Sequence, residues 1–158
     1  MRSFITISFL VLFLSLSFLR TSSGSNKFVC PVTLPDADQS FWYQNRYAHH
    51  NEVLAVYLYT TGSRVIGQSG AWMQDDGYIH SKYPWVKKVA GELTVSGKRL
   101  NGESRRPFIA NYPSFPNNPP GEVPGGFLLP EAGCWKITGN LAGKDLSFVI
   151  NIISPENK

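Results

Sequence analysis

The stretch LPEAGCWKITGNLAGKDLSFVINI, residues 129–152, decides the fold. It contains two runs of alternating apolar and polar residues, joined by a tight turn with a glycine. In the first run Trp135 and Ile137 fall on one face, and in the second run Phe148 and Ile150 do so. A period of two residues is typical of a strand with one buried face. The stretch therefore predicts a terminal β-hairpin, with strands over residues 134–139 and 146–153.

Most other segments also have the composition of short strands. The clearest is VLAVYLYT, residues 53–60, which is rich in β-branched and aromatic residues. Asp75-Asp76-Gly77 lies between two alternating segments, and an Asp-Gly pair in that position is a strong hairpin signal. Residues 93–100 also alternate, and we expect the strand to end or bulge at Gly97. The other predicted strands cover residues 64–66, 71–74 and 78–85.

Residues 106–130 differ from the rest because they hold most of the eleven prolines, together with three glycines. Proline cannot donate a backbone hydrogen bond to a sheet, so the region predicts no central strand. We expect a long proline-rich loop across the end of a sheet, pinned by Phe108, Tyr112 and Phe115. Many short strands without an amphipathic helix predict an all-β fold, an antiparallel β-sandwich.

Residues 1–24 have the layout of a secretory signal peptide. Arg2 supplies a positive start, residues 4–19 form an uncharged apolar run, and small residues follow Arg20. We expect cleavage after this segment, which leaves a single domain of residues 25–158 that is secreted or periplasmic. The alternative is an uncleaved membrane anchor, although the run is short for a bilayer span of about 20 residues.

The charge distribution excludes one class of partner. Removal of the signal also removes Arg2 and Arg20, which leaves thirteen basic residues against eleven acidic ones. These basic residues are scattered along the chain, whereas nucleic-acid binding needs a concentrated basic stripe. We therefore expect no nucleic-acid partner.

Cys30 and Cys134 are the only cysteines in the chain. In an exported protein, two cysteines are expected to form a disulfide. Such a bond closes a loop of roughly 100 residues, which is worth about 4–5 kcal/mol in the chain-entropy model. Two free thiols are the alternative, but neither cysteine lies where a thiol would be activated as a nucleophile.

The C-terminal motif also resembles part of a known group of proteins. Gly133-Cys134-Trp135-Lys136-Ile137-Thr138-Gly139, followed by Leu146-Ser147-Phe148-Val149, is similar to uncharacterised exported bacterial proteins with an immunoglobulin-like β-sandwich. Residues 30–33, 82–85 and 91–100 resemble other parts of the same group. The resemblance implies an immunoglobulin-like sandwich and export to the bacterial envelope, and it implies no catalytic activity. Residues 131–135 are also similar to the tyrosine corner of such domains, with Trp135 in place of the tyrosine.

Three side chains form the best candidate metal site. His49, His50 and Glu52 are close in sequence, and imidazole with carboxylate is a ligand set that zinc accepts. Neighbouring side chains on a strand point to opposite faces, so the two histidines can both bind a metal only from a loop. The alternative is that they are ordinary surface histidines.

The aromatic residues supply the candidate binding residues. Exposed aromatic rings can stack on sugars or on proline-rich peptides. The alternative is that large rings fill the core, which we expect of Trp72, Trp85 and Trp135. The candidate binding residues are Trp42, Tyr43, Tyr47, Tyr112 and Phe115.

These observations predict an exported, non-enzymatic β-sandwich domain without a cofactor. We expect it to bind, or to support structurally, an unidentified protein or glycan component of the cell envelope or the exterior. Two alternative functions stay open: a metal-dependent hydrolase that uses His49, His50 and Glu52, and an extracellular carbohydrate-binding module. A membrane contact is expected only if the signal is retained as an anchor.

Overall fold

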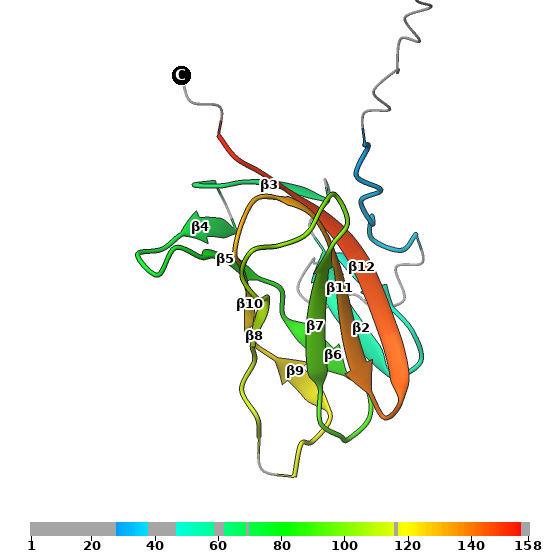
Figure 1. The fold of residues 1–158 in the computed structure, drawn as a ribbon. Helices are drawn as coiled ribbons and strands as arrows, with labels where there is room; N and C mark the ends of the chain where they lie inside the picture. Colours follow the sequence, from blue (N-terminus) through cyan, green and yellow to red (C-terminus); the bar gives the residue numbers. More distant parts are fainter. Residues whose placement is uncertain (1–27, 38–46, 59–61, 69, 116, 156–158) are drawn as a thin grey trace, which may run out of the picture.

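The chain folds as an all-β sandwich, as the sequence predicts (Figure 1). The computed structural model describes residues 28–37, 47–58, 62–68, 70–115 and 117–155, and these residues form twelve strands and no helix. The described parts of the chain therefore contain no helix that is long and apolar enough to cross a membrane. The immunoglobulin-like type of sandwich stays a prediction.

The twelve strands form three sheets of four strands each. The strands are β1 (Tyr47–His50), β2 (Leu54–Leu58), β3 (Ser63–Val65), β4 (Ala71–Met73), β5 (Ile79–Lys82), β6 (Trp85–Lys87), β7 (Thr94–Arg99), β8 (Ile109–Asn111), β9 (Gly121–Val123), β10 (Gly126–Leu129), β11 (Gly133–Leu141) and β12 (Lys144–Ile153). The strand orders in the sheets are β1-β2-β6-β9, β4-β5-β10-β8 and β3-β12-β11-β7. All pairs are antiparallel except β3 with β12, which run parallel.

The predicted terminal hairpin is present and is the longest pair of strands. Trp135 pairs with Ile150, and Ile137 pairs with Phe148. Only Ala142 and Gly143 lie between the paired residues, and both have positive φ angles, of 52° and 75°. Two left-handed residues match the tight turn whose twist suits a two-residue hairpin.

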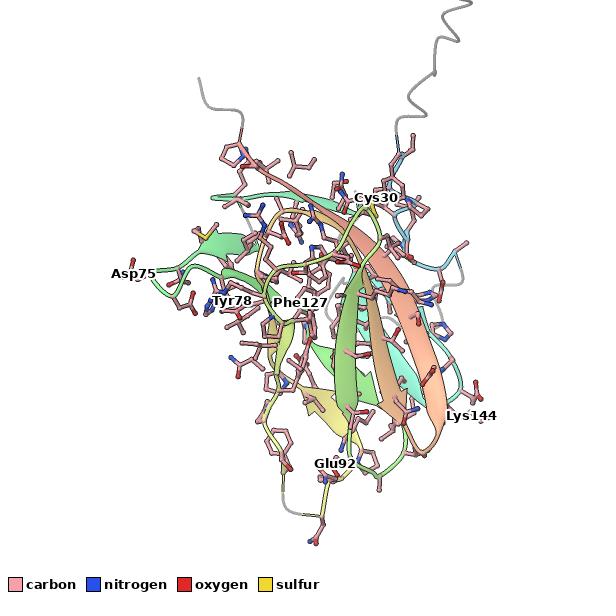
Figure 2. The ribbon with its side chains drawn as sticks, viewed as in Figure 1. Cys30, Asp75, Tyr78, Glu92, Phe127 and Lys144 are labelled. Atoms are coloured by element: carbon pink, nitrogen blue, oxygen red, sulfur yellow. A yellow bond between two sulfur atoms is a disulfide. The ribbon has the colours of Figure 1, made fainter. Side chains whose placement is uncertain are left out.

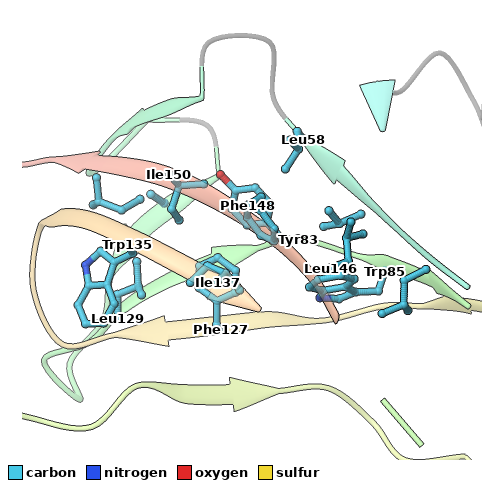
Figure 3. Close-up of a cluster of buried hydrophobic side chains, with 14 of the residues drawn as sticks. Leu58, Tyr83, Trp85, Phe127, Leu129, Trp135, Ile137, Leu146, Phe148 and Ile150 are labelled. Atoms are coloured by element: carbon cyan, nitrogen blue, oxygen red, sulfur yellow. The ribbon is translucent and has the colours of Figure 1, made fainter. Parts of the chain in front are cut away.

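The core lies between the three sheets (Figure 3). It contains the inward side chains of the terminal hairpin, including Trp135 and Phe148, which are at most 1% exposed. The ring centroids of Trp85 and Phe148 are 5.8 Å apart, and those of Tyr83 and Phe127 are 5.0 Å apart. Trp85 and Trp135 are therefore core residues, as the sequence predicts.

The start of β11 is held by three kinds of bond. Cys30 and Cys134 form the predicted disulfide, which ties the N-terminal segment to β11. The indole N–H of Trp135 donates to the backbone oxygen of Glu131 at 3.2 Å. The tryptophan thus bonds to the backbone four residues upstream, as a corner tyrosine does with its hydroxyl. Arg99 of β7 adds an ion pair with Glu131 at 3.0 Å.

The expectation of a long loop without a central strand over residues 106–130 is wrong. This region contains β8, β9 and β10, and β10 lies between β5 and β8 inside a sheet. The physical reason is that the four residues of β10 contain no proline: Pro124 precedes the strand and Pro130 follows it. All of its N–H groups are therefore available to the sheet.

Two of the three aromatic residues expected to pin this region do so. The ring of Phe108 packs against Phe127, with centroids 5.5 Å apart, and the hydroxyl of Tyr112 donates to the backbone oxygen of Tyr83 at 3.0 Å. The expectation that Gly97 ends or bulges its strand is also wrong, since β7 continues through it. A side chain at this position would collide with the ring of Phe108, so the glycine provides space for that ring.

The outer edge of β12 is closed by the N-terminal half of the chain. Thr33 donates its backbone N–H to the oxygen of Val149, and its hydroxyl accepts the N–H of Val149, both at 2.9 Å. The side-chain amide of Asn51 donates to the oxygen of Asp145 at 3.1 Å. These bonds satisfy backbone groups that an open sheet edge would leave exposed to other chains.

Loss of the disulfide should strongly reduce stability. We expect the double variant Cys30→Ala/Cys134→Ala to lose about 4 kcal/mol in free energy of unfolding, because its unfolded chain is no longer cross-linked. Urea denaturation of both proteins under non-reducing conditions, which keep the wild-type disulfide intact, measures this loss. Equal denaturation midpoints for the two proteins would contradict the prediction.

The close approach of β11 to Trp85 makes Gly139 sensitive to substitution. A Cβ atom at this position would lie 2.5 Å from the Trp85 ring, so Gly139→Ala should cost about 1–3 kcal/mol by overpacking. The Trp85→Phe background is the control, since its smaller ring should reduce the cost of Gly139→Ala. An equal cost in both backgrounds, measured by thermal unfolding, would show that the ring is not the cause.

Candidate functional site

The outer face of the sheet β4-β5-β10-β8 carries a row of side chains across all four strands. In the strand register, Trp72 pairs with His80, His80 with Leu128, and Leu128 with Ile109. Side chains of directly paired residues lie on the same face of a sheet. The neighbouring residues Ile79 and Phe127 point to the other face, where they are buried in the core. We call Trp72, His80, Leu128 and Ile109 the outer row.

The outer row is accessible to a partner. Trp72 is 38% exposed and Ile109 is 39% exposed, while Leu128 and His80 are half-buried between them. Neighbouring strands lie about 4.8 Å apart, so the row extends over roughly 14 Å. Single exposed apolar residues are normal on a protein surface, whereas a contiguous apolar surface with a polar rim is typical of an interaction site.

Polar residues border the outer row on both sides. Lys82 and Asn111 flank Gly126 in the next row of paired residues, and both are exposed. Gly126 is required there, because a Cβ atom would collide with the backbone of Ser81. On the other side, Gln74 is exposed two residues after Trp72, just beyond the end of β4.

The hairpin of β4 and β5 projects from the body of the sandwich, with Asp75 at its tip and Tyr78 nearer its base (Figure 2). Arg106 braces this hairpin: its guanidinium lies 3.7 Å from the centre of the Tyr78 ring. The same group donates to the backbone oxygens of Gly77 at 2.9 Å and Asp76 at 3.1 Å. The brace connects the hairpin to the segment that leads into β8, so it joins the two edges of the sheet.

A second brace lies within the hairpin. A carboxylate oxygen of Asp76 lies 2.8 Å from Nε2 of His80, and the other accepts the N–H of Tyr78 at 2.8 Å. The hydrogen bond with His80, followed by the one from Tyr78, lowers the pKa of Asp76 below its ordinary value. His80 is thereby held in a fixed orientation within the outer row.

Among the residues that the structure describes, the aromatic residues predicted to bind do not form one common surface. Trp42 and Tyr43 lie outside the described residues, as does the side chain of Tyr47, whose backbone begins β1. Tyr112 is half-buried, and burial raises the pKa of its hydroxyl well above the ordinary value. Phe115 is 37% exposed but lies beyond the end of β8, outside the outer row.

The expectation that Trp72 belongs to the core is wrong, since Trp72 is 38% exposed. The local sequence does contain a signal that would have found the exposed position. The Asp-Gly turn fixes the register of the hairpin and places Trp72 opposite His80, a polar residue. A polar partner indicates the outer face, and Ala71 is then the inward residue of β4.

The histidines proposed as metal ligands have other partners. Both ring nitrogens of His49 are engaged, Nδ1 with the Asp36 carboxylate at 2.8 Å and Nε2 with the backbone oxygen of Ser147 at 3.1 Å. Glu52 forms an ion pair with Lys144 at 3.4 Å. The part of the chain that the structure describes contains no group of three His, Cys, Asp or Glu side chains that could hold a metal ion. His50 lies beside His49 on β1, where its backbone N–H donates to Asp36 at 2.8 Å.

Comparison with known proteins adds no assignment to this geometry. No protein-family model matches the chain, and neither a curated protein nor a solved structure matches it.

Asp36 should make the stability of the domain depend on pH. Its burial alone would raise the carboxyl pKa, but hydrogen bonds from His49 and from the His50 backbone, with the charges of both rings, lower it below 3.8 overall. A carboxyl whose pKa is lower in the folded state stabilises that state above the unfolded pKa, and this contribution is lost as the pH falls through the folded value.

We therefore expect the stability difference between the wild type and Asp36→Asn to be largest near pH 6 and to shrink as the pH falls below about 4. Urea denaturation at a series of pH values measures this difference. A difference that stays constant from pH 6 to pH 2 would contradict the role assigned to the carboxylate.

Proposed function

We propose that the chain is an exported, disulfide-stabilised β-sandwich that acts by binding a component of the bacterial cell envelope or its surroundings, without catalysis of its own. The observation that carries this proposal is the outer row, an exposed apolar surface with polar borders on a braced sheet. Its side chains offer contact surface, and its one titratable group, His80, is engaged by Asp76.

Two further features support an extracytoplasmic location. The disulfide between Cys30 and Cys134 suits an oxidising compartment, and residues 1–24 have the order of regions found in a secretory signal. The resemblance of the β11 sequence to exported bacterial proteins favours the bacterial envelope as the place of action. The hydrolase alternative gains no support from His49 or Glu52, since each has a structural partner.

The rigidity of the sheet also favours a binding role. Arg106 and Asp76 fix the β4–β5 hairpin before any ligand arrives, so little conformational entropy is lost when a partner binds. A surface that is already rigid can bind a partner through few contacts, because the entropy of ordering its side chains and backbone is lost during folding and not on binding.

Sedimentation with isolated bacterial cell envelopes tests this proposal. The full chain is expressed in a bacterium, purified after export, and mixed with the envelopes. We expect the wild type to sediment with them, and we expect Trp72→Ala/Ile109→Ser to bind at least about tenfold more weakly, through loss of two exposed apolar contacts.

Met73→Ala is the matched control for this experiment. Met73 is 53% exposed and adjacent to Trp72, but strand alternation places it on the other face of β4. Its substitution should leave binding unchanged. Failure of the wild type to bind, or equal binding by the outer-row variant, would refute the proposed function.

A further inference from the structure

We infer that the outer row is a glycan-binding site, in which the indole ring of Trp72 stacks on the apolar face of a sugar. This inference rests on the proposed function and names its ligand class. It uses the exposed ring of Trp72, the apolar neighbours that continue the surface, and the polar residues that border it.

The chemistry of the outer row suits a sugar. A sugar ring has a flat face of C–H groups and an edge of hydroxyl groups, so its recognition needs an apolar surface beside hydrogen-bonding side chains. An indole supplies a large apolar face at low entropic cost. Gln74, which directly follows β4, and Asn111 on β8 place amide groups at the borders of the outer row, where they can both donate to and accept from hydroxyl groups.

The small size of the outer row also favours a glycan over a folded protein. A stable protein–protein interface uses about 20–30 residues on each side, with few charges at its centre. The outer row contains four residues, and Lys82 lies in the next row of pairs while Asp76 binds the imidazole of His80. A strip this narrow with charges at its borders suits an extended chain better than the apolar centre of a folded partner.

The length of the outer row favours a ligand of more than one sugar ring. The row crosses four strands, or roughly 14 Å at about 4.8 Å between neighbouring strands, which exceeds the width of one sugar ring. Trp72 lies at one edge of the sheet and Ile109 at the other. The structure therefore favours an oligosaccharide that lies across the strands, with one ring on Trp72 and others over Leu128 and Ile109.

Two treatments of the envelopes distinguish a glycan from a protein partner. Periodate cleaves sugar rings that carry adjacent hydroxyl groups, and a broad-specificity protease removes exposed protein. We expect periodate to abolish sedimentation of the wild type and protease to leave it unchanged. Loss of binding after protease with full binding after periodate would overturn the glycan inference while the proposed function stands.

Substitutions of Trp72 test the stacking itself. A flat ring is required for a sugar face, whereas an apolar protein pocket also accepts a branched aliphatic side chain. We expect Trp72→Phe to retain part of the binding and Trp72→Leu to weaken it about tenfold. Equal binding by the Phe and Leu variants would overturn the inference.

Soluble oligosaccharides complete the test. A panel of neutral oligosaccharides from envelope and extracellular polysaccharides is titrated into the protein, and tryptophan fluorescence is recorded. We expect at least one member to change the fluorescence of the wild type, and we expect Trp72→Phe to lose that change. The melting temperature of each variant verifies folding, since an exposed substitution should alter stability by no more than about 0.5 kcal/mol. A panel without any response would overturn the glycan inference.

Discussion

Burial of one face of the β11–β12 hairpin is the constraint on which the rest of the structure depends. Trp135 and Phe148 belong to a single core to which all three sheets contribute, and Phe127 of β10 packs against the same group of rings. Because side chains alternate along a strand, fixing Phe127 inward fixes Leu128 outward. Directly paired residues lie on the same face, so His80, which pairs with Leu128, and Trp72, which pairs with His80, also point outward. The exposed surface is thus determined by the buried one.

The sequence was sufficient for features that local patterns encode. The terminal hairpin was predictable because its alternation is long and regular. The disulfide was predictable because the chain has two cysteines and begins with a segment that has the layout of a secretory signal. The strands β8 to β10 were missed because their neighbouring prolines dominate the composition of residues 106–130, while each strand occupies a short gap between prolines. The composition of the whole region does not reveal these short proline-free segments, whereas a strand in a sheet needs only three or four consecutive residues with free N–H groups.

The candidate site was predictable only in part, since exposure of Trp72 depends on strand pairing. Composition alone cannot distinguish Trp72 from Trp85, because both lie in short strands next to turns. The β4–β5 register pairs Trp72 with His80 locally, and the pairing of β5 with β10 then determines which face of that hairpin is buried. This second pairing joins segments more than forty residues apart in sequence. The roles of His49 and Asp36 were equally hidden, because the N-terminal segment meets β1 and β12 only in the folded chain.

Quenching of tryptophan fluorescence by iodide tests the central claim most directly, because iodide reaches only exposed rings. The assignment of faces predicts that Trp72→Phe removes a large part of the quenchable fluorescence of the folded protein. Trp85→Phe and Trp135→Phe should leave the quenchable part unchanged, since these rings are at most 1% exposed. Loss of the quenchable fluorescence in either core variant, with none in Trp72→Phe, would contradict the arrangement of faces and with it the binding surface.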